Sequence, residues 1–173
     1  MSGLPFSGKS YVVDLFVNNI SLDVIIISPK DFIDKSLHNE LSEDEQTEVS
    51  IAAWEASLDL LWSLIESKDN NQIIIYDTAC TSYKRMFPYF DKAKTCGHMI
   101  LFAFINANLS ICEQRAGNKW LPGEVVKAYV TKITNNLPKF IKISDKYIVI
   151  NNNSGVPDVS NIESWIKNNT YNT

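Results

Sequence analysis

The chain has 173 residues, of which 45% are hydrophobic and 21% charged, a composition that fits one globular domain with a substantial core. No apolar run reaches the length of a membrane span and no signal peptide is apparent, so we expect a single cytoplasmic domain over residues 1–173, without a membrane partner. A net charge of −4 argues against a broadly basic nucleic-acid surface but leaves room for a small basic groove. The three cysteines lack metal-ligand spacing, which favours reduced thiols, and the oligomeric state stays open.

The first ten residues carry the most specific pattern of the chain. Residues 3–10 read Gly-Leu-Pro-Phe-Ser-Gly-Lys-Ser and fit G-x-x-x-x-G-K-[ST], a phosphate-binding P-loop. Glycines permit positive φ and bring main-chain N–H groups close to an anion, the lysine reaches the β- and γ-phosphates, and the serine hydroxyl can bind Mg²⁺. The alternative is a chance glycine-serine turn. The predicted nucleotide-binding residues are Gly3, Pro5, Ser7, Gly8, Lys9 and Ser10.

A P-loop normally follows a buried strand, and here only Met1 and Ser2 precede Gly3. We therefore expect the first strand to be missing or truncated, which favours a chain that begins upstream of Met1. The alternative is a complete protein without that strand, which would leave neighbouring strands unpaired.

Beyond the loop, apolar periodicity predicts alternating helices and strands. A capping box at Ser42 and Glu45 opens the longest helix, and Thr81 or Ser82 caps a later one. The predicted strands, the first of them buried on both faces, are 23–28, 72–77, 98–105 and 146–150. The predicted helices are 11–20, 43–67, 83–95, 109–115, 122–135 and 162–166, with a short helix or turn at 30–34, a turn at 68–71 and a frayed Asn-rich end.

This alternation predicts an α/β fold, a three-layer sandwich in which a parallel sheet has helices on both faces. Ligands of such sheets bind at the carboxyl ends of the strands. Asp31, Asp77 and the loop at 3–10 all fall at that edge.

Four side chains outside the loop complete the parts that phosphoryl transfer needs. Asp77 can hold the Mg²⁺ shell or bind substrate, and Asp31 can accept the proton of an acceptor hydroxyl. Arg115 and Lys119 can close over the phosphates from a lid, one helical turn apart if their helix continues. In the alternative interpretation, Asp31 caps a short helix and both cations are solvated.

With these residues in place, the chain from Gly3 to about Leu137 resembles the P-loop kinases typified by phage polynucleotide 5′-kinases, a group that extends to zeta toxins, seryl-tRNA kinases and antibiotic phosphotransferases. The resemblance rests on residues 3–10, 27–31, 75–78 and 112–122. It implies ATP and Mg²⁺ as cofactors. It further implies that Asp31 is the general base, Asp77 an acceptor-side carboxylate, and Arg115 with Lys119 the lid.

The chain departs from the family pattern on the acceptor side. Where the family often has Ser-x-Asp, this chain has Ser28-Pro29-Lys30-Asp31, with the aspartate one place late. An arginine expected near residues 33–34 and an asparagine expected near 79–80 are absent. The resemblance implies an ATP-dependent kinase of a hydroxyl acceptor, with a polynucleotide 5′-hydroxyl as first choice. A small metabolite, a nucleotide sugar, a modified base, an ATPase or switch without acceptor, and a non-catalytic P-loop protein remain open.

Overall fold

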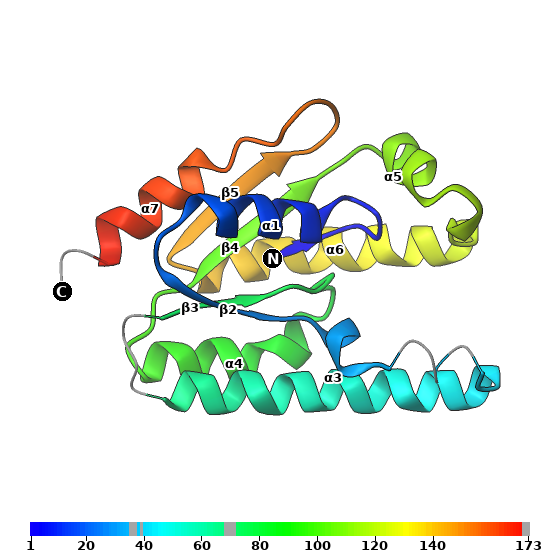
Figure 1. Cartoon of the computed structure of the whole chain (residues 1–173), viewed down its shortest axis with the longest axis horizontal. Helices are drawn as coiled ribbons and strands as arrows, with labels where there is room; N and C mark the ends of the chain where they lie inside the picture. The colour runs from blue at the N-terminus through cyan, green and yellow to red at the C-terminus, as the bar shows by residue number, and fades with distance from the viewer. Residues whose placement is uncertain (35–37, 39, 68–71, 171–173) are drawn as a thin grey trace.

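A computed structural model describes residues 1–34, 38, 40–67 and 72–170 (Figure 1). It confirms the predicted alternation of helices and strands. The turn predicted at 68–71 and the end of the chain at 171–173 lie outside the described residues. The strands are β1 (Ser2–Gly3), β2 (Asp23–Ile27), β3 (Gln72–Tyr76), β4 (Leu101–Asn106) and β5 (Lys146–Asn151). The helices are α1 (Lys9–Asn19), α3 (Glu43–Glu66), α4 (Tyr83–Thr95), α5 (Leu109–Ala116), α6 (Gly123–Ile143) and α7 (Ser160–Thr170), with 3₁₀ turns η1 (Pro29–Phe32) and η2 (Gly117–Lys119).

All strand pairs in the described part of the chain are parallel. They form a three-stranded sheet in the order β1-β4-β5 and a two-stranded sheet of β2 and β3. The amine of Met1 donates to the carbonyl of Tyr76 at 2.7 Å, so β1 lies between β3 and β4. The first strand, expected to be missing or truncated, is present over two residues: Ser2 pairs with Phe104, and Gly3 pairs with Ile105.

Two hydrophobic cores lie on the two faces of these strands, which makes three layers. On one face, α1 and α7 pack against β3, β4 and β5 through residues such as Phe16, Ile105 and Ile162. On the other face, α3, α4 and α6 pack through residues such as Leu61 and Phe140. Figure 1 shows α3 and α4 running side by side below the strands, with α1 and α7 on the opposite side.

Three predicted boundaries or environments were wrong, each because tertiary structure prevails over local pattern. Strand β2 pairs only with β3 among the described strands, so it is an edge strand and Ile26 is 40% exposed rather than buried. Helix α6 continues past Pro138 to Ile143, because Phe140 is buried and stacks on Phe102 at 4.9 Å. Strand β4 begins at Leu101, three residues after the predicted start at residue 98. The main-chain N–H of His98 instead donates to the Ala93 carbonyl and so belongs to the C-terminal end of α4.

The start of α3 follows the capping-box prediction. The Ser42 side chain accepts from the main chain of Glu45, and the Glu45 carboxylate accepts from the main-chain N–H of Ser42 at 2.9 Å. Ser82 caps α4 by accepting from the main-chain N–H of Arg85. Among the helices that the structure describes, none is both long and apolar enough to cross a membrane.

Candidate functional site

The backbone between β1 and α1 is bent by three residues with positive φ: Gly3 at 151°, Phe6 at 61° and Gly8 at 85°. The main-chain N–H of Ser7 donates to the Leu4 carbonyl at 3.1 Å and closes the turn. A Cβ on Gly3 would lie 2.6 Å from the Ile105 carbonyl oxygen. The two glycines of the motif are therefore required by conformation and by space, and the turn leads straight into the N-terminus of α1, where N–H groups favour an anion.

Lys9 lies over this turn and is the first residue of α1. Its Nζ donates to the main-chain carbonyls of Leu4 at 2.8 Å and Gly3 at 3.3 Å. Burial lowers the pKa of the Lys9 ammonium, and the charge of Asp77 acts in the opposite direction. A phosphate in the loop would supply the opposite charge that this partly desolvated ammonium needs.

Ser10 and Asp77 form the second part of the site, although 67 positions separate them. The Ser10 hydroxyl donates to Asp77 Oδ2 at 2.7 Å. Asp77 follows β3 directly and is 6% exposed, and its main-chain N–H donates to the Ile27 carbonyl at the end of β2. The carboxyl edge of the strands thus places the serine of the motif against a buried carboxylate, as its position after β3 predicts.

The donor set at Ser10 and Asp77 fits Mg²⁺. Asp77 Oδ1 is buried and has no hydrogen-bond partner among the described residues, so one carboxylate oxygen remains available. Mg²⁺ prefers hard oxygen ligands and is commonly held by one or two protein oxygens together with substrate phosphates. No cluster of three or more His, Cys, Asp or Glu that could hold a metal occurs in the described part of the chain, so most ligands would come from a bound phosphate and water.

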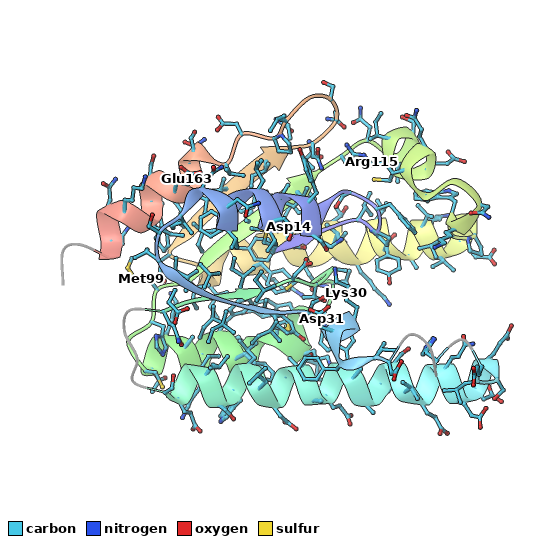
Figure 2. The ribbon with its side chains drawn as sticks, viewed as in Figure 1. Asp14, Lys30, Asp31, Met99, Arg115 and Glu163 are labelled. Atoms are coloured by element: carbon cyan, nitrogen blue, oxygen red, sulfur yellow. The ribbon has the colours of Figure 1, made fainter. Side chains whose placement is uncertain are left out.

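Lys30 also reaches this position. Its Nζ donates to the Ser10 hydroxyl at 2.7 Å and lies 3.8 Å from Asp77 Oδ2. Asp31, its neighbour in η1, is exposed, and its main-chain N–H donates to the Ser28 carbonyl at 2.9 Å. Figure 2 shows both side chains at η1, and of the two it is Lys30 that contacts Ser10 and Asp77.

Arg115 extends from α5 to the opposite side of the loop (Figure 2). Its guanidinium donates to the Ser7 carbonyl at 3.1 Å and to the Asn152 carbonyl at 2.8 Å. The Asn152 side chain, 1% exposed, donates to the same Ser7 carbonyl at 2.8 Å. We name Arg115, Asn152 and Ser7 the loop clamp.

Sequence reasoning missed Asn152. A signal was present, because Asn152 follows β5 at the same edge as Asp77, but it falls in a run of three asparagines and the pattern could not single it out.

Lys119 is exposed and does not share a helix with Arg115. Helix α5 ends at Ala116, because Gly117 has a φ of 55°, and Lys119 lies in η2. The helix does not continue to Lys119, so the condition under which the two cations would lie one helical turn apart is not met. The segment after η2 still returns to the loop, since the rings of Trp120 and Phe6 lie 6.2 Å apart.

A groove of about 560 Å³ lies along the N-terminal half of α3, beside α4. Trp54 and Arg85 line it, and the Arg85 guanidinium stacks on the Trp54 ring at 4.6 Å. Trp54 also contacts Tyr76 edge-to-face at 6.0 Å, and burial raises the pKa of Tyr76 to about 12. Tyr76 and Asp77 are neighbours in the chain, but successive side chains at a strand point to opposite faces, and the groove is lined from α3, α4 and His38 rather than by Ser10 or Asp77.

The geometry defines an α/β protein with a glycine turn between a strand and a helix N-terminus and a neighbouring hydroxyl–carboxylate pair. Comparison with protein-family models finds no match, and no curated protein matches the sequence at a significant level.

Proposed function

We propose that this chain is a P-loop phosphotransferase that moves the γ-phosphate of ATP to a hydroxyl acceptor. The observation that carries the proposal is the pairing of the Ser10 hydroxyl with the buried Asp77 carboxylate at 2.7 Å, directly beside a loop that fits the P-loop motif. A glycine turn alone is common, whereas this turn combines a lysine, a serine and a carboxylate from another strand.

In the proposed reaction, main-chain N–H groups of the loop and the Lys9 ammonium hold the β- and γ-phosphates. Ser10 and Asp77 orient Mg²⁺, which supplies charge neutralisation at the phosphates when it is bound. Arg115 contacts the loop through Ser7 and supplies a further cation on the lid side. Asp31 is the proposed acceptor of the hydroxyl proton, by its place at the end of β2 and by the resemblance.

The acceptor that we propose to test first is a polynucleotide 5′-hydroxyl. The resemblance suggests it, and the groove along α3 adds the aromatic Trp54 and the cation Arg85 as side chains that could contact a nucleic acid. Aromatic side chains stack on bases, and arginine side chains contribute cation–π contacts in proteins that bind single strands. The groove is open enough to accept a small metabolite or a nucleotide sugar as well, so these acceptors belong in the same experiment.

One observation favours a second function, an ATPase without an acceptor. Lys30, a cation, contacts Ser10 and Asp77, while the nearby carboxylate of Asp31 is exposed. A phosphotransferase needs a carboxylate close to the acceptor hydroxyl, whereas hydrolysis needs only an oriented water molecule.

The test is γ-labelled ATP with Mg²⁺, offered with 5′-hydroxyl DNA, 5′-hydroxyl RNA and a panel of metabolites. We expect label to appear on one acceptor class with the parent protein and not with Lys9→Ala. Release of inorganic phosphate without labelled acceptor supports the ATPase instead. Failure of the parent to bind ATP in equilibrium dialysis would contradict both functions.

A further inference from the structure

Lys30 lies against the two oxygen-bearing groups that fit a divalent metal. Its Nζ is 2.7 Å from Ser10 Oγ and 3.8 Å from Asp77 Oδ2, and its side chain is 54% exposed while that of Asp77 is 5% exposed. The Asp77 carboxylate therefore has one oxygen near a cation and one oxygen without a partner among the described residues. The resemblance to P-loop kinases expects an aspartate where Lys30 stands, so this contact is a feature of this chain.

A divalent ion and the Lys30 ammonium compete for these oxygens. Mg²⁺ binds oxygen at about 2.0–2.1 Å, so an ion on Ser10 Oγ would place two positive charges within a few ångströms of each other. Lys9 adds to the repulsion, since it directly precedes Ser10 and carries a further positive charge. One of the cations has to leave, and Lys30 is the one on a flexible, half-exposed stem.

We propose that Lys30 is a built-in counterion of Ser10 and Asp77 that a divalent metal displaces. The displaced ammonium moves toward the next available anion, the phosphates of the bound nucleotide. The proposal rests on the proposed function for the identity of that nucleotide, but the competition between Lys30 and the metal does not need ATP. Lys30 therefore weakens metal binding to the free protein and strengthens nucleotide binding when metal is absent.

The experiment measures these two effects separately, because they have opposite signs. Lys30→Met removes the charge and keeps the apolar stem. Lys142→Met is the matched control, since Lys142 is exposed near the end of α6, before β5, at the opposite edge of the strands. Electron paramagnetic resonance of Mn²⁺, without nucleotide, gives the metal affinity, and displacement of a fluorescent ATP analogue in EDTA gives the metal-free nucleotide affinity.

We expect Lys30→Met to bind Mn²⁺ about tenfold tighter than the parent and the metal-free nucleotide about three- to tenfold more weakly, whereas Lys142→Met leaves both unchanged. Asp77→Asn in the Lys30→Met background should abolish the gain in Mn²⁺ affinity.

If Lys30 only supports the structure, its substitution would weaken the binding of both Mn²⁺ and the nucleotide. The proposal is overturned if Lys30→Met binds Mn²⁺ no more tightly than the parent, or if neither protein binds Mn²⁺. Absence of nucleotide binding together with a gain in Mn²⁺ affinity would contradict the proposed function and leave the competition established.

Discussion

The side-chain amide of Asn152 donates to the main-chain carbonyl of Ser7 at 2.8 Å, although 145 positions separate the two residues. Asn152 also accepts from Arg115 through its main-chain carbonyl. The end of β5 is therefore bonded to the middle of the loop, and the conformation of the loop depends on a residue outside the motif.

Asn152→Ala tests this dependence. Removing a buried amide that pairs with a main-chain carbonyl should lower the free energy of unfolding by about 1–3 kcal/mol and weaken nucleotide binding, because the loop loses its brace. Urea denaturation and equilibrium dialysis measure the two effects. Asn151→Ala is the control, since Asn151 is exposed and pairs with Asn106 instead. Equal nucleotide affinity in the two variants would contradict a role for the loop clamp.

Gly8→Ala should damage the loop more than a glycine substitution elsewhere. The added Cβ would lie 2.3 Å from Asn152 Nδ2 at a φ of +85°, so both space and conformation oppose it. Gly155→Ala is the matched control, because Gly155 has a φ of +70° with nothing within 4 Å of the new Cβ. Both variants should lose about 1 kcal/mol or more from the positive φ. Only Gly8→Ala should lose nucleotide binding as well. If Gly8→Ala still binds nucleotide, the loop does not depend on the close contact between residue 8 and Asn152.

Lys9→Ala should lower turnover by about 10²–10³-fold while the fold survives, because the lysine contacts main-chain carbonyls rather than the core. Circular dichroism and the labelled-ATP assay together measure the two outcomes. Phosphoryl transfer at close to the parent rate would contradict the P-loop interpretation.

The lowered pKa of Lys9 also predicts that the stability of the protein depends on pH. Burial lowers its pKa in the folded chain, so the unfolded chain binds more protons between the lowered value and the ordinary one. The free energy of unfolding contributed by this group therefore increases as pH rises through that interval. As pH rises toward the ordinary lysine pKa of about 10.4, the parent should gain stability relative to Lys9→Ala in urea denaturation. A difference that is constant with pH would show that the pKa of Lys9 is not lowered.

Asp31→Asn should lower the rate of phosphoryl transfer to the acceptor by about 10²–10⁴-fold, because the amide cannot accept the proton. ATP should still bind to this variant. Asp34→Asn is the control, since it removes a nearby exposed carboxylate in the same loop. Transfer rates and ATP affinities of both variants decide between them. If Asp34→Asn is the inactive variant, the one-place offset from the family pattern was misread. If neither variant loses transfer, the general base lies elsewhere.

Local chemistry made much of the fold predictable. The capping box at Ser42 and the β-branched run at 23–27 specify their elements without help from distant residues. The length of α6 was not predictable, because Pro138 signals an end and only the stacking of Phe140 on Phe102 keeps the helix going. In the site, Lys9 and Ser10 are specified by a motif. Asn152 and Lys30 act through contacts across 145 and 20 positions, and no local pattern encodes such pairs.

The contact between Phe6 and Trp120 gives the protein an intrinsic optical reporter. The Trp120 ring lies on the segment after η2 and its neighbour Phe6 lies inside the loop, so any ligand that reshapes the loop changes the surroundings of one indole. The tryptophans at 54 and 62 contact cations on α4 instead, and Trp165 packs against the core shared by α1 and α7. Titration of tryptophan emission, with Trp120→Phe as the silent reference, would follow ligand entry in real time without any attached dye.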